Sequence, residues 1–60
     1  MIVYVNNEPV ELLPGMTVRH ALIQAALLNR LKEGKRIYDE WRNEIGLDGA
    51  LHENMKIFVR

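Results

Sequence analysis

Cysteine and serine are both absent from this 60-residue chain, and its apolar runs are short. Without cysteine the chain has no disulfide, no thiolate nucleophile and no cysteine-ligated zinc or iron–sulfur site. The run Ala25–Leu28 has only four residues, whereas a membrane-spanning helix needs roughly 20 apolar residues. The sequence therefore predicts neither a membrane segment nor a secretion signal, and it favours the cytoplasm.

Net charge is absent as well. Eight basic and eight acidic residues cancel, and because they are interspersed we expect no strong long-range field that attracts nucleic acid or an anionic membrane. Hydrophobic residues make up 48% of the chain, which is enough for a packed core. A chain this short forms one domain at most, so residues 1–60 are expected to be a single domain.

A β-hairpin is predicted at the start of the chain. Met1–Val5 is rich in β-branched and aromatic residues and stops at Asn6-Asn7, a pair that tolerates the positive φ of a tight turn. Val10–Leu12 alternates apolar and polar residues, so its two apolar side chains are expected on the same buried face as those of the first strand.

One helix is predicted from Val18 to Arg30 or Leu31, with Gly34 as its C-terminal stop. Thr17 precedes it as an N-cap whose hydroxyl accepts a backbone N–H from the first turn. At 100° per residue, one side of this helix carries a core stripe formed by Val18, Ala21, Leu22, Ala25 and Leu28. A second apolar row, Ile23, Leu27 and Leu31, lies nearly opposite. This row is either covered by the loop around Leu47 and Leu51 or left as a docking patch.

Three short strands are predicted in the second half of the chain, namely Arg36–Asp39, Glu44–Leu47 and Lys56–Val59. In the last of them Ile57 and Val59 face one side and Phe58 the other. The predicted fold is therefore α+β, with the order ββαβββ and one helix packed across a mixed sheet.

This order is the β-grasp (ubiquitin-like) pattern, and three segments resemble the small sulfur-carrier proteins of thiamine and molybdopterin biosynthesis. Ile2–Asn7 is similar to that family's first strand and Asn-containing turn, and Leu13–Val18 is similar to its Pro-Gly, any residue, Thr-Val entry to the helix. Leu51–Ile57 is similar to its approach to the final strand. The TGS domains of some synthetases and nucleotide-regulatory enzymes share the same pattern.

The resemblance implies a relative of the carriers without their reactive tail. Members of that family end in a flexible Gly-Gly whose carboxylate is adenylylated and converted to a thiocarboxylate, whereas this sequence ends at Arg60, directly after the last predicted strand. No carrier residue is therefore transferred to this chain. A sulfur carrier whose native chain continues to Gly-Gly is the alternative.

No catalytic or metal-binding constellation is predicted. Thr17, the one aliphatic hydroxyl, is expected to cap the helix rather than to act as a nucleophile. His20 and His52 lack a third ligand at a recognised spacing. Glu40 and Glu44 flank an expected hairpin tip, where solvent keeps both ionised. We expect no enzyme activity, no cofactor and no metal.

The leading hypothesis is a small non-catalytic interaction module that docks on a partner protein through one sheet face or the second helix face. Trp41 lies in an expected turn, where its ring either folds back over Tyr38, as we expect, or stands exposed as a binding anchor. The candidate partner-binding residues are Ile23, Leu27, Leu31, Trp41, Phe58 and Arg60.

Two further alternatives stay open at the level of sequence. One is an RNA-binding module of the TGS kind that uses a basic cluster near the helix ends, made of Arg19, Arg30, Lys32, Lys35 and Arg36. The other is a homodimer through an uncovered edge strand or through the row that contains Ile23.

Overall fold

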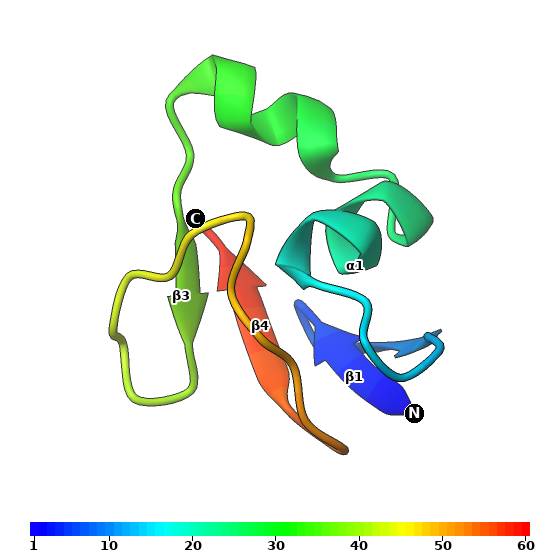
Figure 1. Ribbon diagram of the computed structural model, residues 1–60. Helices are drawn as coiled ribbons and strands as arrows, with labels where there is room; N and C mark the ends of the chain where they lie inside the picture. The colour runs from blue at the N-terminus through cyan, green and yellow to red at the C-terminus, as the bar shows by residue number, and fades with distance from the viewer.

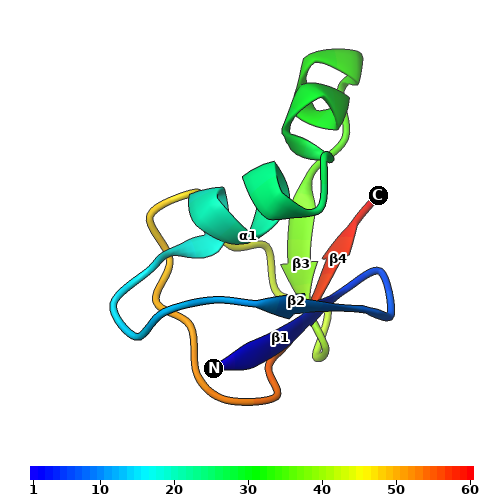
Figure 2. The same cartoon turned by 90° about the vertical axis from the view of Figure 1, so that its right-hand side faces the viewer.

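The computed structural model describes residues 1–60 and contains a four-stranded mixed sheet with helical turns on one side (Figures 1 and 2). The elements along the chain are β1 (Ile2–Val5), β2 (Glu8–Glu11), α1 (Val18–Gln24), the 3-10 helix η1 (Leu28–Glu33), β3 (Ile37–Asp39) and β4 (Lys56–Val59). The strand order is β2-β1-β4-β3, with β1 antiparallel to β2 and parallel to β4, and β3 antiparallel to β4. The α+β class expected from the sequence is confirmed.

The hairpin at the start of the chain is also confirmed. Val5 pairs with Glu8, so Asn6 and Asn7 alone form the loop, and both have positive φ, at 50° and 71°. A two-residue turn with two positive φ values matches the right-handed twist of the flanking strands. This turn sets the register that places Val3 opposite Val10.

The core lies between α1 and the inner face of the sheet. Buried side chains alternate with exposed or half-buried ones along β1 and β4, so Val3, Val5 and Ile57 face α1. α1 contributes Val18, Ala21 and Leu22 to the same cluster. The full set of buried residues is Val3, Val5, Val10, Leu12, Val18, Ala21, Leu22, Ile37, Met55, Ile57 and Val59.

The predicted helix to Arg30 or Leu31 is wrong, because α1 ends at Gln24. Ala26 takes a left-handed conformation, with φ 59°. Its N–H donates to Ile23 O at 3.1 Å, and the N–H of Leu27 donates to Leu22 O at 2.9 Å. This pair of hydrogen bonds is the Schellman motif, which usually carries glycine at the left-handed position. Gly34, with φ 89°, instead ends η1.

The predicted strand Glu44–Leu47 is also wrong, so the sheet has four strands rather than five. Glu44 forms a single bridge to Tyr38. The chain then leaves the sheet and turns its carbonyls toward the start of α1. Arg19 N–H donates to Leu47 O at 2.9 Å, and Val18 N–H donates to Gly49 O at 3.2 Å. These carbonyls satisfy donors that a helix N-terminus leaves without intrahelical partners.

No helix in the structure has the length and the apolar character that crossing a bilayer requires.

Candidate docking face of the sheet

The outer face of the sheet carries no helix. Figure 2 shows α1 on one side of the strands, and the side chains that alternate with the core residues point to the other side. On β1 these outward residues are Ile2 and Tyr4, and on β4 they are Lys56 and Phe58. Tyr38 is the outward residue of β3. We call this surface the outer face.

Three aromatic rings lie on neighbouring strands of the outer face. Tyr38 on β3 pairs directly with Phe58 on β4, and Tyr4 on β1 pairs with Lys56, the outward neighbour of Phe58 on the same strand. Side chains directly opposite each other in a sheet have Cβ atoms roughly 5 Å apart. The three rings are half-buried, since each is flanked by its neighbours on the sheet but covered by no further layer.

Arg60 extends this aromatic row. Its guanidinium carbon lies 4.9 Å from the centroid of the Phe58 ring, within the range of a cation–π contact. The backbone of Arg60 exchanges two hydrogen bonds with Arg36, at 2.7 and 2.9 Å, which fix its position beyond the end of β4. A hollow of about 410 Å³ is lined by Arg60 together with Tyr38 and Arg42.

The arginines differ in whether they have a carboxylate partner. Arg19 lies 3.6 Å from Asp48, and Arg30 lies 3.4 Å from Glu33. Arg36 donates to Glu44 at 3.0 Å, and this hydrogen bond and the charge of Glu44 raise the pKa of Arg36 above its ordinary value. Arg42 and Arg60 form no ion pair in the structure.

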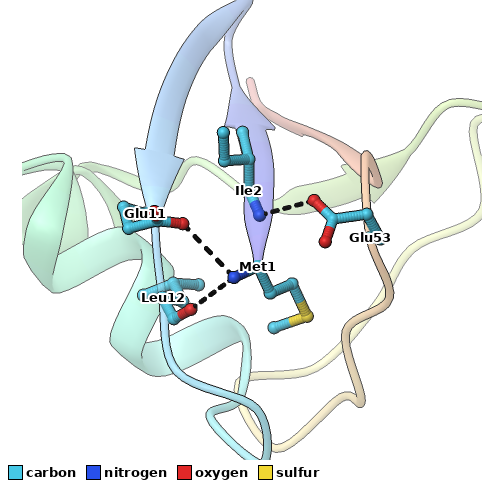
Figure 3. Close-up of polar contacts among 5 residues, drawn as sticks. All are labelled: Met1, Ile2, Glu11, Leu12 and Glu53. Carbon is cyan, nitrogen blue, oxygen red and sulfur yellow. Dashed lines mark hydrogen bonds and ion pairs between the residues drawn. The ribbon is translucent and has the colours of Figure 1, made fainter.

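Two carboxylates, those of Glu53 and Glu11, are engaged at the other end of the sheet. Glu53 accepts a hydrogen bond from Ile2 N–H at 2.8 Å (Figure 3). Glu11 lies 3.2 Å from the amino group of Met1, which also donates to Leu12 O at 2.9 Å. Because β1 and β4 run parallel, this corner lies at the opposite end of the sheet from Arg60 (Figure 1). The end of the outer face near Arg60 holds the Arg36–Glu44 ion pair together with the unpaired guanidinium groups of Arg42 and Arg60, which give this end its excess positive charge.

Both edges of the sheet are protected against pairing with a further strand. Along β3, Ile45 N–H donates to Ile37 O at 2.9 Å and Asp39 N–H donates to Asn43 O at 3.0 Å, so the following loop covers this edge. β2 forms the other edge, where Pro9 has no N–H and Glu8 and Glu11 add charge. Proline and charged side chains are features by which proteins avoid pairing at an edge. The open surface of the sheet is therefore its outer face.

Trp41 stands exposed in the turn after β3, with 67% of its surface accessible. The expected fold-back over Tyr38 is therefore wrong. The carboxylate of Asp39 accepts hydrogen bonds from the N–H groups of Trp41 and Asn43, both at 2.9 Å. Arg42 has φ 68° in this turn. These contacts hold the indole away from the core and bring Arg42 back toward Tyr38.

The second apolar row does not form. Because α1 ends at Gln24, the three residues no longer share one helix face. Ile23 is 54% exposed, whereas Leu27 and Leu31 are half-buried and pack against the core. The interpretation of this row as a docking patch is wrong, and the physical reason is the left-handed Ala26.

Thr17 and His20 have the structural role expected of a helix cap. Thr17 N–H donates to His20 Nδ1 at 3.0 Å, and Thr17 Oγ1 lies 3.2 Å from the same nitrogen. His20 thus takes the place of the Glu or Gln that usually completes a capping box. No three histidine or carboxylate side chains lie close enough together to hold a metal ion.

The basic cluster considered for RNA is largely neutralised. Three of its five residues, Arg19, Arg30 and Arg36, lie within ion-pair distance of a carboxylate. Lys32 and Lys35 have no such partner. This arrangement weakens the case for a phosphate-binding surface near the helix ends, because phosphate contacts depend on free cations.

Comparisons with protein-family models, curated proteins and solved structures give no match to this chain. The chemistry of the outer face consists of aromatic surface, phenol hydroxyls and guanidinium donors. Such groups are suited to recognise apolar and anionic groups. Sequence reasoning selected Phe58, Arg60 and Trp41, but it missed Tyr4, Tyr38 and Arg42. Outward alternation on each strand was the available signal for both tyrosines.

Proposed function

We propose that this chain is a small non-catalytic protein-interaction module of the β-grasp type, which acts in the cytoplasm and docks on a partner protein through its outer face. The observation that carries this proposal is the row of Tyr4, Phe58 and Tyr38 on neighbouring strands of a face that no helix covers. The hairpin, the single α-helix and the parallel pairing of β1 with β4 support the β-grasp assignment.

Aromatic and arginine side chains make the outer face suitable for docking. Tyrosine, tryptophan and arginine are enriched among the residues that dominate interface energies. Large aromatic rings bury much apolar area while losing little side-chain entropy, which favours their use in contacts with another protein. Since Tyr38 and Phe58 already pack side by side, a partner would find this part of the surface pre-organised.

A non-catalytic role is supported by the contacts of three potentially reactive side chains, Asp39, His20 and Glu53. Asp39 is hydrogen-bonded to two backbone N–H groups of its own turn. His20 accepts the N–H of Thr17, and Glu53 accepts the N–H of Ile2. Each of these groups stabilises local backbone structure, which leaves it poorly placed to transfer a proton to a substrate.

Affinity capture with face variants tests the proposal. Wild-type protein and the Phe58→Asp variant would be immobilised and incubated with a lysate of cells that produce the protein, and retained proteins would be quantified by mass spectrometry. Ile23→Asp is the matched control, because it places the same charge on an exposed apolar position of α1 away from the sheet. Circular dichroism would establish that each variant is folded.

We expect the same retained proteins with wild type and Ile23→Asp, and their loss with Phe58→Asp. Retention of the same proteins by all three would contradict docking through the outer face. Tyr38→Asp gives a second test on the neighbouring strand if Phe58→Asp does not fold.

A further inference from the structure

We propose that the hollow between Tyr38, Arg42 and Arg60 is a carboxylate-binding subsite, through which the outer face recognises an acidic segment of its partner protein. This inference rests on the proposed docking function and names the chemistry of the partner. The occupant is a short stretch of chain that presents aspartate or glutamate side chains among apolar ones.

The first support is the distribution of ion pairs among the five arginines. Arg19, Arg30 and Arg36 each have a carboxylate within 3.6 Å. Arg42 and Arg60 have none, and these two line the same hollow. Two arginines that line one hollow and have no ion-pair partner favour an anionic ligand there, since an anion in the hollow is attracted by both charges.

The second support is that the fold holds the guanidinium group of Arg60 and the backbone of Arg42 in place. The backbone of Arg60 is hydrogen-bonded to Arg36, and its guanidinium lies over the Phe58 ring. Arg42 N–H donates to Asp39 O at 3.2 Å within the turn that the Asp39 carboxylate stabilises. A guanidinium presents a planar fork that matches a carboxylate, and pre-positioning reduces the entropy lost on binding.

The surroundings of the hollow favour a carboxylate of a protein over a nucleic-acid phosphate. A nucleic-acid strand needs a track of cations along its backbone. On the outer face Lys56 and Arg36 add to Arg42 and Arg60, but Arg36 is already paired with Glu44 at 3.0 Å, so the free cations do not form a continuous track. The carboxylates of Glu11 and Glu53 lie at the other end of the sheet. A short acidic segment meets the positive end with its carboxylates and the aromatic row with its apolar side chains.

Fluorescence anisotropy with two labelled peptides tests this inference. The probe is a ten-residue peptide of glutamate, leucine and glycine, and its counterpart has glutamine in place of each glutamate. The variant is Arg42→Asn with Arg60→Gln, since asparagine tolerates the positive φ at position 42. The matched control is Lys32→Gln with Lys35→Gln, which removes the same two charges away from the hollow. A labelled oligouridine of eight nucleotides serves as the nucleic-acid probe.

We expect the glutamate peptide to bind the wild type and the lysine control alike, and to lose at least about tenfold in affinity for the arginine variant. The glutamine peptide should bind the wild type at least about tenfold more weakly. No binding of the glutamate peptide, equal weakening in both double variants, or tighter binding of oligouridine than of the peptide would each overturn the inference.

The capture experiment separates failure of this inference from failure of the docking proposal. If only the acidic partner is wrong, Phe58→Asp still loses the retained proteins while the arginine variant keeps them. If docking through the outer face is wrong, neither variant changes what is retained. Loss of the same proteins from both variants, with the lysine control unchanged, is the expected result.

Discussion

The side-chain oxygen Oδ1 of Asn6 accepts a hydrogen bond from the backbone N–H of Val59 at 2.9 Å. Along the parallel pair β1 and β4, Tyr4 N–H donates to Met55 O and Asn6 N–H donates to Ile57 O. The next acceptor in such a ladder would be the backbone carbonyl of Asn6. Because Asn6 has φ 50°, the chain turns away there, and its side chain takes the place of that carbonyl.

Substitution of Asn6 and Asn7 by glycine is expected to have different effects. Both positions keep a residue that accepts positive φ, but Asn6→Gly also removes the acceptor for Val59. We expect a loss of about 1 kcal/mol in the free energy of unfolding for Asn6→Gly. Asn7→Gly should stay within about 0.5 kcal/mol of wild type, since Asn-Gly suits this turn. Urea unfolding measures both, and equal losses would show that the bond to Val59 contributes nothing.

Glycine at positions 25 and 26 is expected to change stability in opposite directions. Ala26 lies in the left-handed region, where a β-carbon is unfavourable, so Ala26→Gly should raise the free energy of unfolding by about 0.5–1 kcal/mol. Ala25 has φ −84° and packs against the core, so Ala25→Gly should lower it by at least about 0.5–1 kcal/mol. Thermal unfolding followed by circular dichroism provides the comparison. A lower midpoint for Ala26→Gly would contradict the Schellman ending of α1.

Aspartate at positions 23 and 27 distinguishes an exposed residue from a half-buried one that packs against the core. Ile23 is exposed, so Ile23→Asp should change the free energy of unfolding by less than about 0.5 kcal/mol. Leu27 packs against the core just after α1, so Leu27→Asp should lower it by more than about 2 kcal/mol. Chemical denaturation of the two variants tests this, and a folded, fully stable Leu27→Asp protein would contradict the position of Leu27.

The cap at Thr17 gives a prediction about His20. His20→Ala removes the acceptor for Thr17 N–H and should lower the free energy of unfolding by about 0.5–1 kcal/mol. His20→Gln restores a residue typical of the capping box and should recover most of that loss. Amide exchange of Thr17 offers a local measurement, with faster exchange expected in the alanine variant alone. Unchanged exchange in both variants would argue against the cap.

The sequence correctly predicted those parts of the fold that are determined by residues close together along the chain. The β-branched and aromatic content of Met1–Val5, the Asn6-Asn7 pair and the alternation along Val10–Leu12 predicted the hairpin and its buried face, because all three signals lie within a few residues. The end of α1 was missed since Ala26 adopts a conformation that usually indicates glycine. The strand at Glu44–Leu47 was predicted in error because the chain leaves β3 after Ile45, and the carbonyl of Leu47 then accepts a hydrogen bond from α1, which is distant in sequence.

The candidate site was predicted only in part for a related reason. Alternation placed Phe58 on the outward side of its strand, but its neighbours there depend on strand order and register. The pairing of Tyr38 with Phe58 and the return of Arg42 toward Tyr38 come from the fold of β3 and its turn. Exposure of Trp41 follows from hydrogen bonds of Asp39 to the turn, which composition does not indicate.

The central strand pair joins the two ends of this sequence, since β1 covers Ile2–Val5 and β4 covers Lys56–Val59. During synthesis the hairpin can form early, but β1 lacks its second neighbour until β4 has left the ribosome. Contacts between residues far apart in sequence form slowly, because the loop between them must close first. The core around Val3 and Val5 is therefore incomplete until β4 adds Ile57 and Val59 to it, and closing the long loop between β1 and β4 is the step that completes it.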